Sequence, residues 1–239
     1  MKKLIEIKDL TKEFNGNIVL KGISLDIYEN EFVTLLGPSG CGKSTLLSII
    51  SGLEPKTSGE IHIEGKIGYM LQKDNLLEWR TIYKNVLLGL EIQKDKTQEN
   101  IEYTENLLKK YGLYEFKDKY PTQLSGGMRQ RAALIRTLAV RPKILLLDEA
   151  FSALDYQTRL TVSCDVWQIL RREGKTMVMV THDIPEAVAM SDKIIILSHR
   201  PAIGKKILMP EFGDKNPTRR RESPMFSRYF NEVWREMTP

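Results

Sequence analysis

The sequence has few cysteines and no long hydrophobic run. Cys41 and Cys164 are its two cysteines among 239 residues, far too few for the disulfide framework of a small secreted domain. No run reaches the roughly 18 consecutive apolar residues of a transmembrane helix, and the N-terminal region contains no apolar signal-peptide segment. We therefore expect a chain that works in a reducing compartment, without a membrane span or an export signal.

The composition is that of a globular protein with a mild excess of positive charge. Hydrophobic residues make up 41% and charged residues 28%, and 239 residues suit one large domain or one with a grafted subdomain. Much of the net charge of +5 lies near the C-terminus, in Lys205, Lys206, Lys215, Arg219, Arg220, Arg221, Arg228 and Arg235. Such a stretch is most often a solvated face; contact with acidic lipid headgroups or nucleic acid is the other interpretation.

Alternating patterns along the chain predict an α/β fold. Residues 3–10 alternate apolar and polar side chains as a half-buried strand does, 11–17 read as a turn, and 18–28 resume an extended pattern. Further strands are expected at 32–36, 61–63, 67–70, 144–147, 176–180, 193–198 and 203–208, and helices from about 43 and at 82–92, 98–111, 128–140, 156–172, 184–190 and 225–237. This order favours a mostly parallel sheet, preceded by antiparallel strands and interrupted by an inserted helical subdomain.

A glycine-rich segment between a strand and a helix predicts a phosphate-binding loop. It reads Gly37-Pro38-Ser39-Gly40-Cys41-Gly42-Lys43-Ser44-Thr45 and has the P-loop spacing G-x-x-x-x-G-K-[ST]. The glycines let successive backbone N–H groups turn inward, and the helix that starts near Lys43 adds its positive end. Lys43 would contact the β- and γ-phosphates, and the Ser44 hydroxyl would bind Mg²⁺. We therefore predict that the chain binds a nucleoside triphosphate.

Four polar residues directly follow apolar stretches that read as strands. Asp148 would hold Mg²⁺ through water, and Glu149 is the candidate base that polarises the attacking water. Because ligands gather at the carboxyl ends of parallel strands, Asp148 and Lys43 are expected to meet. Gln72 would ligate Mg²⁺ and orient the water, and His182 would contact the γ-phosphate. Either of the last two, taken alone, would be read as structural.

A second segment has the features of an anion site. Ser125, Gly126, Gly127 and Met128 open a predicted helix, so that the serine could cap it while the glycines form a turn. The free N–H groups at such a helix start also form an anion site, which needs a phosphate supplied from elsewhere. Phe14, before the first turn, is either a core side chain or a face on which an adenine stacks.

The order of these motifs resembles the ATP-binding-cassette (ABC) ATPases. The P-loop matches their Walker A motif, Gln72 their Q-loop and Ser125-Gly126-Gly127 their signature. Asp148-Glu149 then matches Walker B, Ser152-Ala153-Leu154-Asp155 the D-loop and His182 the H-loop. The resemblance runs from residue 3 to about residue 208. Within the family, the chain looks most like the ATPase subunits of nitrate/sulfonate/taurine-type importers, and segments 70–81, 124–130 and 151–159 carry this similarity. Met128 replaces the usual signature glutamine, and Phe14 stands where a tyrosine often stacks on adenine.

The resemblance implies an ATPase that uses Mg²⁺ and drives a membrane importer for a small solute, an anion such as nitrate, sulfonate or taurine. Two copies would pair head to tail, each ATP lying between one P-loop and the other copy's Ser125-Gly126-Gly127, with Met128 and Asp155 close by. Residues 1–239 would form one ABC domain, with a helical subdomain at 76–140 and a basic tail at 209–239. Integral membrane permease subunits would press near Leu76, Leu77, Trp79 and Arg80, at the cytoplasmic face of the membrane. These residues read as an exposed apolar loop, which a docking role would explain.

A separate solute-binding protein would complete that transporter, and no nucleic acid is expected as a partner. The alternative is a soluble member of the family that acts on nucleic acid or ribosomes, which the basic tail alone supports. A third interpretation, a non-catalytic assembly protein gated by ATP, is disfavoured because Lys43, Asp148, Glu149 and His182 are all present.

Overall fold

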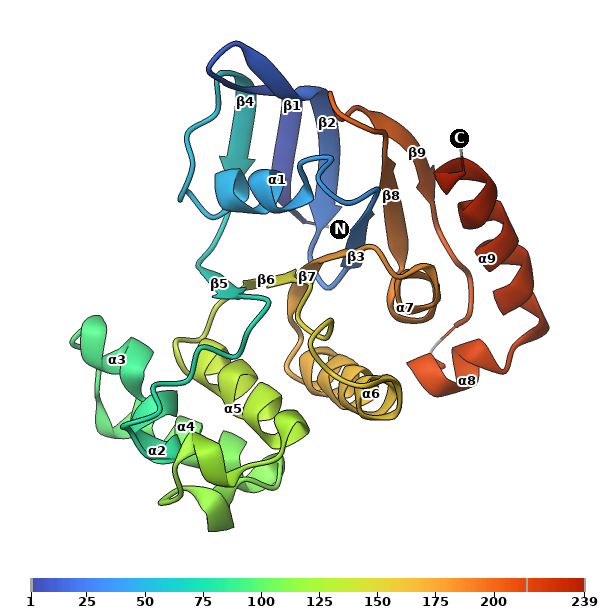
Figure 1. The fold of residues 1–239 in the computed structure, drawn as a ribbon. Helices are drawn as coiled ribbons and strands as arrows, with labels where there is room; N and C mark the ends of the chain where they lie inside the picture. The colour runs from blue at the N-terminus through green and yellow to red at the C-terminus, as the bar shows by residue number, and fades with distance from the viewer. Residues whose placement is uncertain (1, 214, 239) are drawn as a thin grey trace.

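The computed structural model describes residues 2–213 and 215–238, which form two sheets and surrounding helices (Figure 1). The smaller sheet is antiparallel with strand order β2-β1-β4, from β1 (Lys3–Phe14), β2 (Asn17–Tyr28) and β4 (Ser58–Ile63). The larger sheet has the order β5-β6-β7-β3-β8-β9. Its strands are β3 (Phe32–Leu36), β5 (Ile67–Met70), β6 (Ile144–Asp148), β7 (Thr176–Thr181), β8 (Lys193–Leu197) and β9 (Gly204–Leu208).

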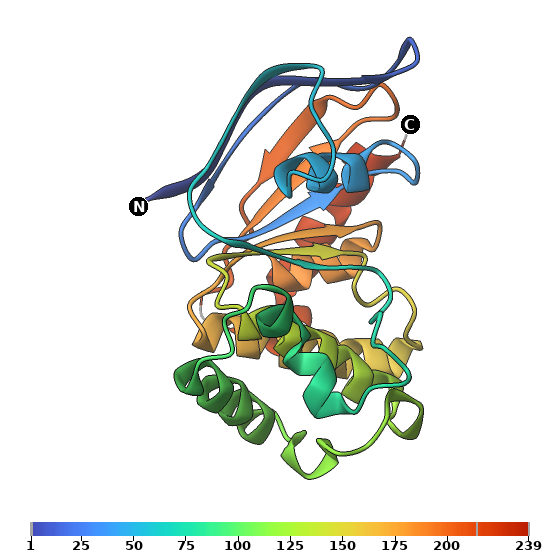
Figure 2. The same ribbon diagram turned by 90° about the vertical axis from the view of Figure 1, so that its left-hand side faces the viewer.

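The larger sheet is parallel from β5 to β8 and gains one antiparallel edge strand, β9. Its central strands are buried on both faces, and alternate side chains belong to different cores. Leu145 and Leu147 pack among helices on one face, whereas Ile144 and Leu146 pack with the small sheet and α1 (Lys43–Ile50) on the other. Figure 2 shows these layers on either side of the sheet. The predicted α/β class, with a P-loop core and antiparallel strands before it, is confirmed.

The helices between β5 and β6 gather below the sheet in Figure 1. They are α2 (Ile82–Val86), α3 (Leu88–Ile92), α4 (Gln98–Lys110) and α5 (Gly126–Ala139), with 3₁₀ turns at Tyr114–Phe116 and Pro121–Gln123. The single helix expected at 82–92 is thus two short helices. Thr81 caps the first of them, because its Oγ1 accepts a 3.3 Å hydrogen bond from the Lys84 N–H.

The first hairpin differs from its predicted boundaries. β1 continues to Phe14 instead of turning at Thr11, and Phe14 pairs with Asn17. Asn15 and Gly16 make the whole turn, with φ values of 48° and 82°. Positive φ at both positions is the mark of a two-residue type I′ hairpin, which fits the twist of the flanking strands. The turn is therefore shorter than the run of polar residues suggested.

Two helices at the C-terminus pack against α7 (Ile184–Met190), and α6 (Tyr156–Arg172) lies beside them. They are α8 (Pro217–Arg221) and α9 (Pro224–Met237). Val233 of α9 shares a core with Leu36 and Val188. Arg220 is 3% exposed and donates to the Ala189 and Ser191 carbonyls at 3.3 and 3.0 Å. For this arginine the expectation of a solvated face is wrong.

The part of the chain that the structure describes contains no helix long and apolar enough to cross a bilayer.

Candidate active site

The P-loop joins β3 to α1 through a turn that only glycine fits. Gly40 and Gly42 have φ values of 74° and 120°, which side chains disfavour. A Cβ on Gly42 would also lie 2.8 Å from Val19 Cγ1 and 2.9 Å from Leu20 Cδ2. The hairpin strand β2 therefore presses on the loop from behind, and the glycine allows that approach.

Lys43 lies across the loop with its side chain nearly buried. Its Nζ donates to the carbonyls of Gly37 and Pro38 at 2.8 and 2.9 Å, and 5% of the residue is exposed. This geometry holds a cation inside the curl of the loop, where a phosphate would lie. Arg200, which follows β8, donates to the Gly40 carbonyl at 2.9 Å. No sequence motif pointed to this second cation beside the loop.

Ser44 and Asp148 meet although 104 positions separate them. Ser44 Oγ donates to Asp148 Oδ1 at 2.9 Å, and the Tyr69 hydroxyl donates to Asp148 Oδ2 at 3.1 Å. Burial, followed by the Asp148 charge, raises the pKa of Tyr69 to about 12, so the phenol stays a donor. A hydroxyl and a carboxylate are oxygen ligands of the kind that Mg²⁺ takes while keeping several waters. The pair therefore fits Mg²⁺; sequence reasoning missed Tyr69, which sits inside β5 without a motif.

Glu149, His182 and Gln72 form a second polar group next to that pair. His182 Nδ1 lies 3.2 Å from Glu149 Oε1. Gln72 Nε2 lies 3.5 Å from Glu149 Oε2 and donates to Ser152 Oγ at 3.1 Å. Gln72 thus faces the candidate base, and among the described residues its side-chain hydrogen bonds go to neither Ser44 nor Asp148. Glu149 has a φ of 45°, a strained value that is typical of functional sites.

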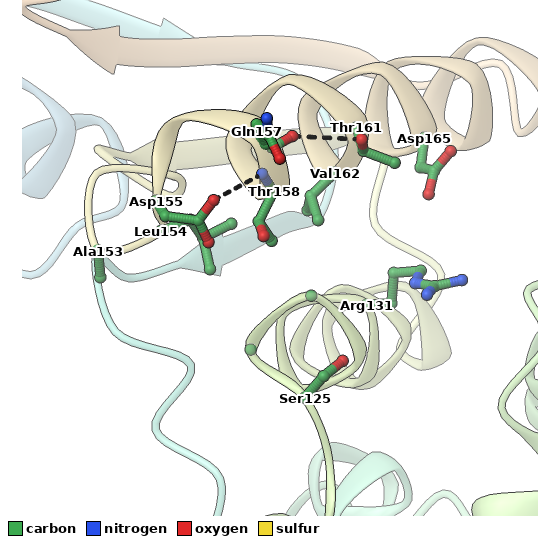
Figure 3. A pocket seen from close by; sticks show the side chains of 12 residues that line it. Ser125, Arg131, Ala153, Leu154, Asp155, Gln157, Thr158, Thr161, Val162 and Asp165 are labelled. Carbon is green, nitrogen blue, oxygen red and sulfur yellow. Dashed lines mark hydrogen bonds between the residues drawn. The ribbon is translucent and has the colours of Figure 1, made fainter.

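The signature residues Ser125 to Gly127 and the later D-loop residues Ala153 to Asp155 lie together beside a groove. Ser125 Oγ caps α5 by accepting from the Met128 N–H at 3.4 Å, and Asp155 Oδ1 caps α6 by accepting from the Thr158 N–H at 3.0 Å. The hydrogen bonds at Thr158 lower the pKa of Asp155. A groove of about 510 Å³ runs between these two helix starts (Figure 3). It is lined by Gly126, Gly127 and Ala153 as well.

Gly127 lets the two helices approach. A Cβ on it would lie 2.9 Å from Val162 Cγ2 in α6. Among the described residues, no hydrogen bond or ion pair joins residues 125–128 or Asp155 to the P-loop residues 37–45. The two segments that the sequence predicts to bind phosphate, the P-loop and the start of α5, thus share no direct polar contact within the described part of the chain.

Phe14 and the loop after Gln72 are only partly as expected. The Phe14 ring is 41% exposed, so it is not a core side chain, and Lys12 Nζ lies 4.3 Å from its centroid. Trp79 is 75% exposed as predicted for an open loop. Leu76, in contrast, is 6% exposed because it packs in the core of the helical region.

Comparison with known proteins decides the family. A family model described as ABC transporter matches residues 20–152, more than half of the 239 residues. The chain belongs to this family of ATP-binding cassettes. The ABC transporter ATP-binding protein YtlC of Bacillus subtilis, itself described as uncharacterized, is 46% identical over 228 residues, covering 91% of this chain and 88% of YtlC. The nitrate import ATP-binding protein NrtD of Synechocystis is 37% identical, covering 96% of this chain and 93% of NrtD.

Solved cassettes share the fold. The dimeric structure of the bacterial ABC transporter cassette MJ0796 has a TM-score of 0.74 at 33% identity and covers 87% of this chain and 99% of its own. A post-hydrolysis dimer of MJ0796 bound to ADP and Pi has a TM-score of 0.72, also at 33% identity, with the same coverage. The chain is therefore an ATP-hydrolysing subunit of an importer-type ABC transporter. The predicted ATP-binding function is confirmed.

Proposed function

We propose that this ABC ATPase works as a head-to-tail dimer that hydrolyses two ATP molecules and thereby powers the uptake of a small solute. The observation that carries the proposal is the separation of two anion-binding features within one chain. Lys43 and the P-loop amides suit the triphosphate from one side, and the start of α5 at Ser125 suits the γ-phosphate from the other. The dimeric MJ0796 cassettes support this pairing.

Each side chain of the site has one task in hydrolysis. Lys43 neutralises the β- and γ-phosphates while Phe14 stacks on the adenine. Water attacks the γ-phosphorus and its proton passes to the Glu149 carboxylate. The bond between the γ-phosphorus and the β–γ bridging oxygen breaks, so that ADP leaves with that oxygen and inorganic phosphate is released. His182, 3.2 Å from Glu149, holds that carboxylate and contacts the γ-phosphate.

Mg²⁺, held at Ser44 and Asp148, would neutralise charge on the β- and γ-phosphate oxygens. Gln72 orients the attacking water and would ligate the metal. Gly37, Pro38, Ser39, Gly40, Cys41, Gly42 and Thr45 supply the loop around the phosphates. Gly126, Gly127, Met128 and Asp155 complete the site of the other copy.

Transport requires contact with membrane subunits. Trp79 is 75% exposed on the loop after Gln72, and aromatic side chains of this kind anchor protein interfaces. We infer that permease subunits dock there, beside Leu77 and Arg80, and hold the ATPase at the cytoplasmic face of the membrane, with a separate solute-binding protein on the other side. A small anion such as nitrate, sulfonate or taurine is the proposed solute, supported by the similarity to NrtD.

Two alternatives to an anion importer are a polyamine importer and a soluble ATPase. Relatives named as spermidine/putrescine import proteins, such as PotA of Spiroplasma citri, are 40% identical, but this chain spans only 59% of that protein. A soluble ABC ATPase that acts on nucleic acid or ribosomes would use the basic C-terminal stretch. Arg220 and Lys206 of that stretch are, however, engaged within the chain, in contacts with Ser191 and Glu232.

Co-purification decides between these functions. Detergent extraction of membranes that contain the tagged protein should yield integral membrane subunits with it, and Trp79→Ala should reduce their recovery without changing ATP hydrolysis by the isolated protein. Recovery of RNA or ribosomal protein instead, with no membrane subunit, would contradict the importer assignment. Transport assays with nitrate, taurine and spermidine would then identify the solute.

A further inference from the structure

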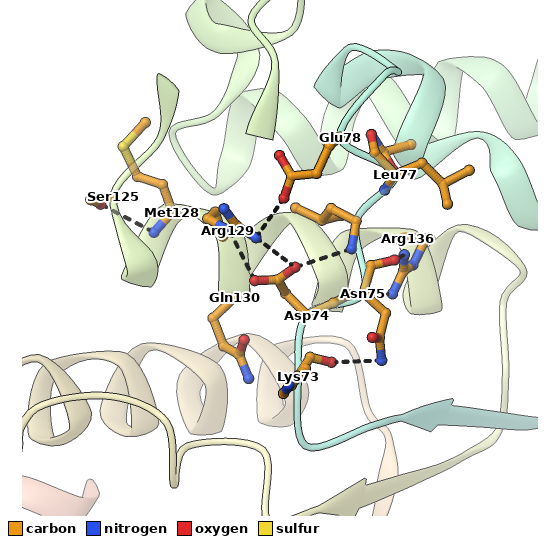
Figure 4. Close-up of polar contacts among 12 residues, drawn as sticks. Lys73, Asp74, Asn75, Leu77, Glu78, Ser125, Met128, Arg129, Gln130 and Arg136 are labelled. Atoms are coloured by element: carbon orange, nitrogen blue, oxygen red, sulfur yellow. Dashed lines mark hydrogen bonds and ion pairs between the residues drawn. The ribbon is translucent and has the colours of Figure 1, made fainter. Parts of the chain in front are cut away.

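Arg129, in the first turns of α5, holds the loop that follows Gln72. Its Nε donates to Asp74 Oδ2 at 2.9 Å and its Nη2 to Asp74 Oδ1 at 3.3 Å, while Nη2 also lies 3.0 Å from Glu78 Oε1 (Figure 4). Burial alone would raise the pKa of Asp74, but the Arg129 hydrogen bond and the Leu76 N–H hold it below its ordinary value. This bidentate contact fixes the orientation of the two side chains as well as the distance between them.

A second arginine of α5 holds the same segment by its backbone. Arg136 donates to the carbonyls of Asp74 and Asn75, both at 2.6 Å. Residues 129 and 136 are seven positions apart, so they lie on one face of the helix. The segment 74–78 is therefore attached to α5 at two levels, and it should move with that helix as one body.

Gln72, two residues earlier, is attached to the catalytic centre instead. Its amide donates to Ser152 Oγ at 3.1 Å and lies 3.5 Å from Glu149 Oε2, and Ser152 Oγ donates to the Glu149 carbonyl at 2.9 Å. Lys73 alone separates Gln72 from Asp74, and Lys73 is exposed. Within the three residues 72–74, the chain therefore contacts first Glu149, through Gln72, and then α5, through Asp74.

We propose that the Asp74–Arg129 ion pair is the positioning contact through which the catalytic centre of one chain controls the Ser125 that the same chain presents to a second copy. The inference rests on the proposed dimer, because Ser125 acts on the other copy's ATP. A shift of Gln72 on binding ATP is passed through Lys73 to Asp74, and the ion pair transmits it to the first turn of α5. Neither Asp74 nor Arg129 touches the reacting atoms.

A purely structural role for the pair makes a different prediction. The two side chains are 19% and 28% exposed, and partly exposed ion pairs contribute little to stability. Loss of the pair should therefore leave folding almost unchanged. If the pair positions Ser125, its loss should weaken the ATP-dependent dimer and slow turnover while the P-loop keeps its nucleotide affinity.

The test uses Asp74→Asn, Arg129→Gln and the double variant, each in the Glu149→Gln background. The asparagine keeps an oxygen for the Leu76 N–H, which Asp74 Oδ1 now accepts at 3.0 Å, but it removes the charge and places an amide donor where Oδ2 accepts from Arg129 Nε. Glu99→Gln is the matched control, because it breaks the 2.9 Å ion pair between Glu99 and Arg141 near the other end of α5. Sedimentation with ATP and Mg²⁺ gives the dimer dissociation constant, and a fluorescent ATP analogue gives the affinity of the P-loop.

We expect each single variant to weaken the dimer about tenfold, and the double variant to weaken it no more than Arg129→Gln alone, because that change already removes the contact between the two side chains. Glu99→Gln should stay within about twofold of its parent, as should P-loop affinity in every variant. With Glu149 restored, kcat should fall with the dimer. Dimerisation of Asp74→Asn equal to that of its parent would overturn this inference alone. Failure of the Glu149→Gln parent to dimerise would overturn the proposed dimer and the inference with it.

Discussion

His182 Nδ1 lies 3.2 Å from Glu149 Oε1, although the two residues come from the ends of different strands, β7 and β6. The contact joins the candidate base of hydrolysis to the residue that would sense the γ-phosphate. Because β6 and β7 are parallel neighbours in the sheet, their carboxyl ends deliver both side chains to the same edge. Glu149 also has a φ of 45°, a strained backbone value of the kind that gathers at functional sites.

Replacement of Glu149 by glutamine should abolish turnover without loss of ATP binding. The change removes the carboxylate that accepts the proton of water but leaves Ser44 and Asp148, which are hydrogen-bonded to each other at 2.9 Å. General-base assistance is worth about 10²–10⁴-fold in rate, so steady-state hydrolysis should fall by at least about a hundredfold. Near-normal phosphate release by this variant would rule out Glu149 as the base.

Lys43→Ala should instead weaken the binding of ATP. The ammonium is the cation inside the P-loop, 2.8 Å from the Gly37 carbonyl, and its loss leaves two phosphate charges without a partner. Titration with a fluorescent ATP analogue should show an affinity about tenfold lower or worse. Lys56→Ala, an exposed lysine in the loop before β4, is the control and should bind as the parent does. Equal affinities for the two variants would contradict the P-loop assignment.

Glu186 should make the stability of the protein depend on pH. Burial, with a smaller contribution from the neighbouring Asp183, raises the pKa of this carboxyl from 4.5 to about 7, against the opposing effects of Thr181, Arg159 and Arg221. The folded protein then binds this proton more tightly than the unfolded chain does. The stability that the proton contributes is complete below pH 4.5 and is lost as the pH rises through about 7.

Glu186→Gln should remove this loss. Relative to the wild type, the glutamine variant should gain up to about 3 kcal/mol in free energy of unfolding between pH 4.5 and 8. Urea unfolding at a series of pH values measures the difference, and Glu222→Gln, at an exposed position, serves as the control. A difference between Glu186→Gln and the wild type that does not change with pH would show that Glu186 does not titrate in this range.

Much of this site could be predicted from the sequence because its residues occupy fixed places relative to strands. A glycine turn after β3, an acid after β6 and a histidine after β7 are local signals, and a parallel sheet brings strand ends together without further information. The same holds for the cap at Ser125, since a cap depends on the residues that follow it in the chain. Asp155 was named through the family resemblance, and its cap of α6 is a finding of the structure.

What could not be predicted depends on contacts between distant segments. Nothing near Tyr69 or Arg200 in the sequence says that one meets Asp148 and the other meets Gly40. The basic residues before α9 looked solvated, yet Arg220 is buried against the end of α7, where carbonyls and the Trp167 ring receive it. Leu76 looked exposed for a similar reason: its polar neighbours hide the fact that the helical core covers it.

The central claim is that each active site is shared between two copies, and ATP-dependent dimerisation tests it most directly. In the Glu149→Gln background, ATP with Mg²⁺ should shift the protein from monomer to dimer in sedimentation. Ser125→Arg should block that shift by its bulk and by occupying the phosphate site, while the isolated P-loop still binds nucleotide. The matched control is Thr97→Arg, which removes the comparable cap of α4, a 3.3 Å bond from the Asn100 N–H. The account predicts a dimer for the control and a monomer for Ser125→Arg; equal dimerisation of both would contradict it.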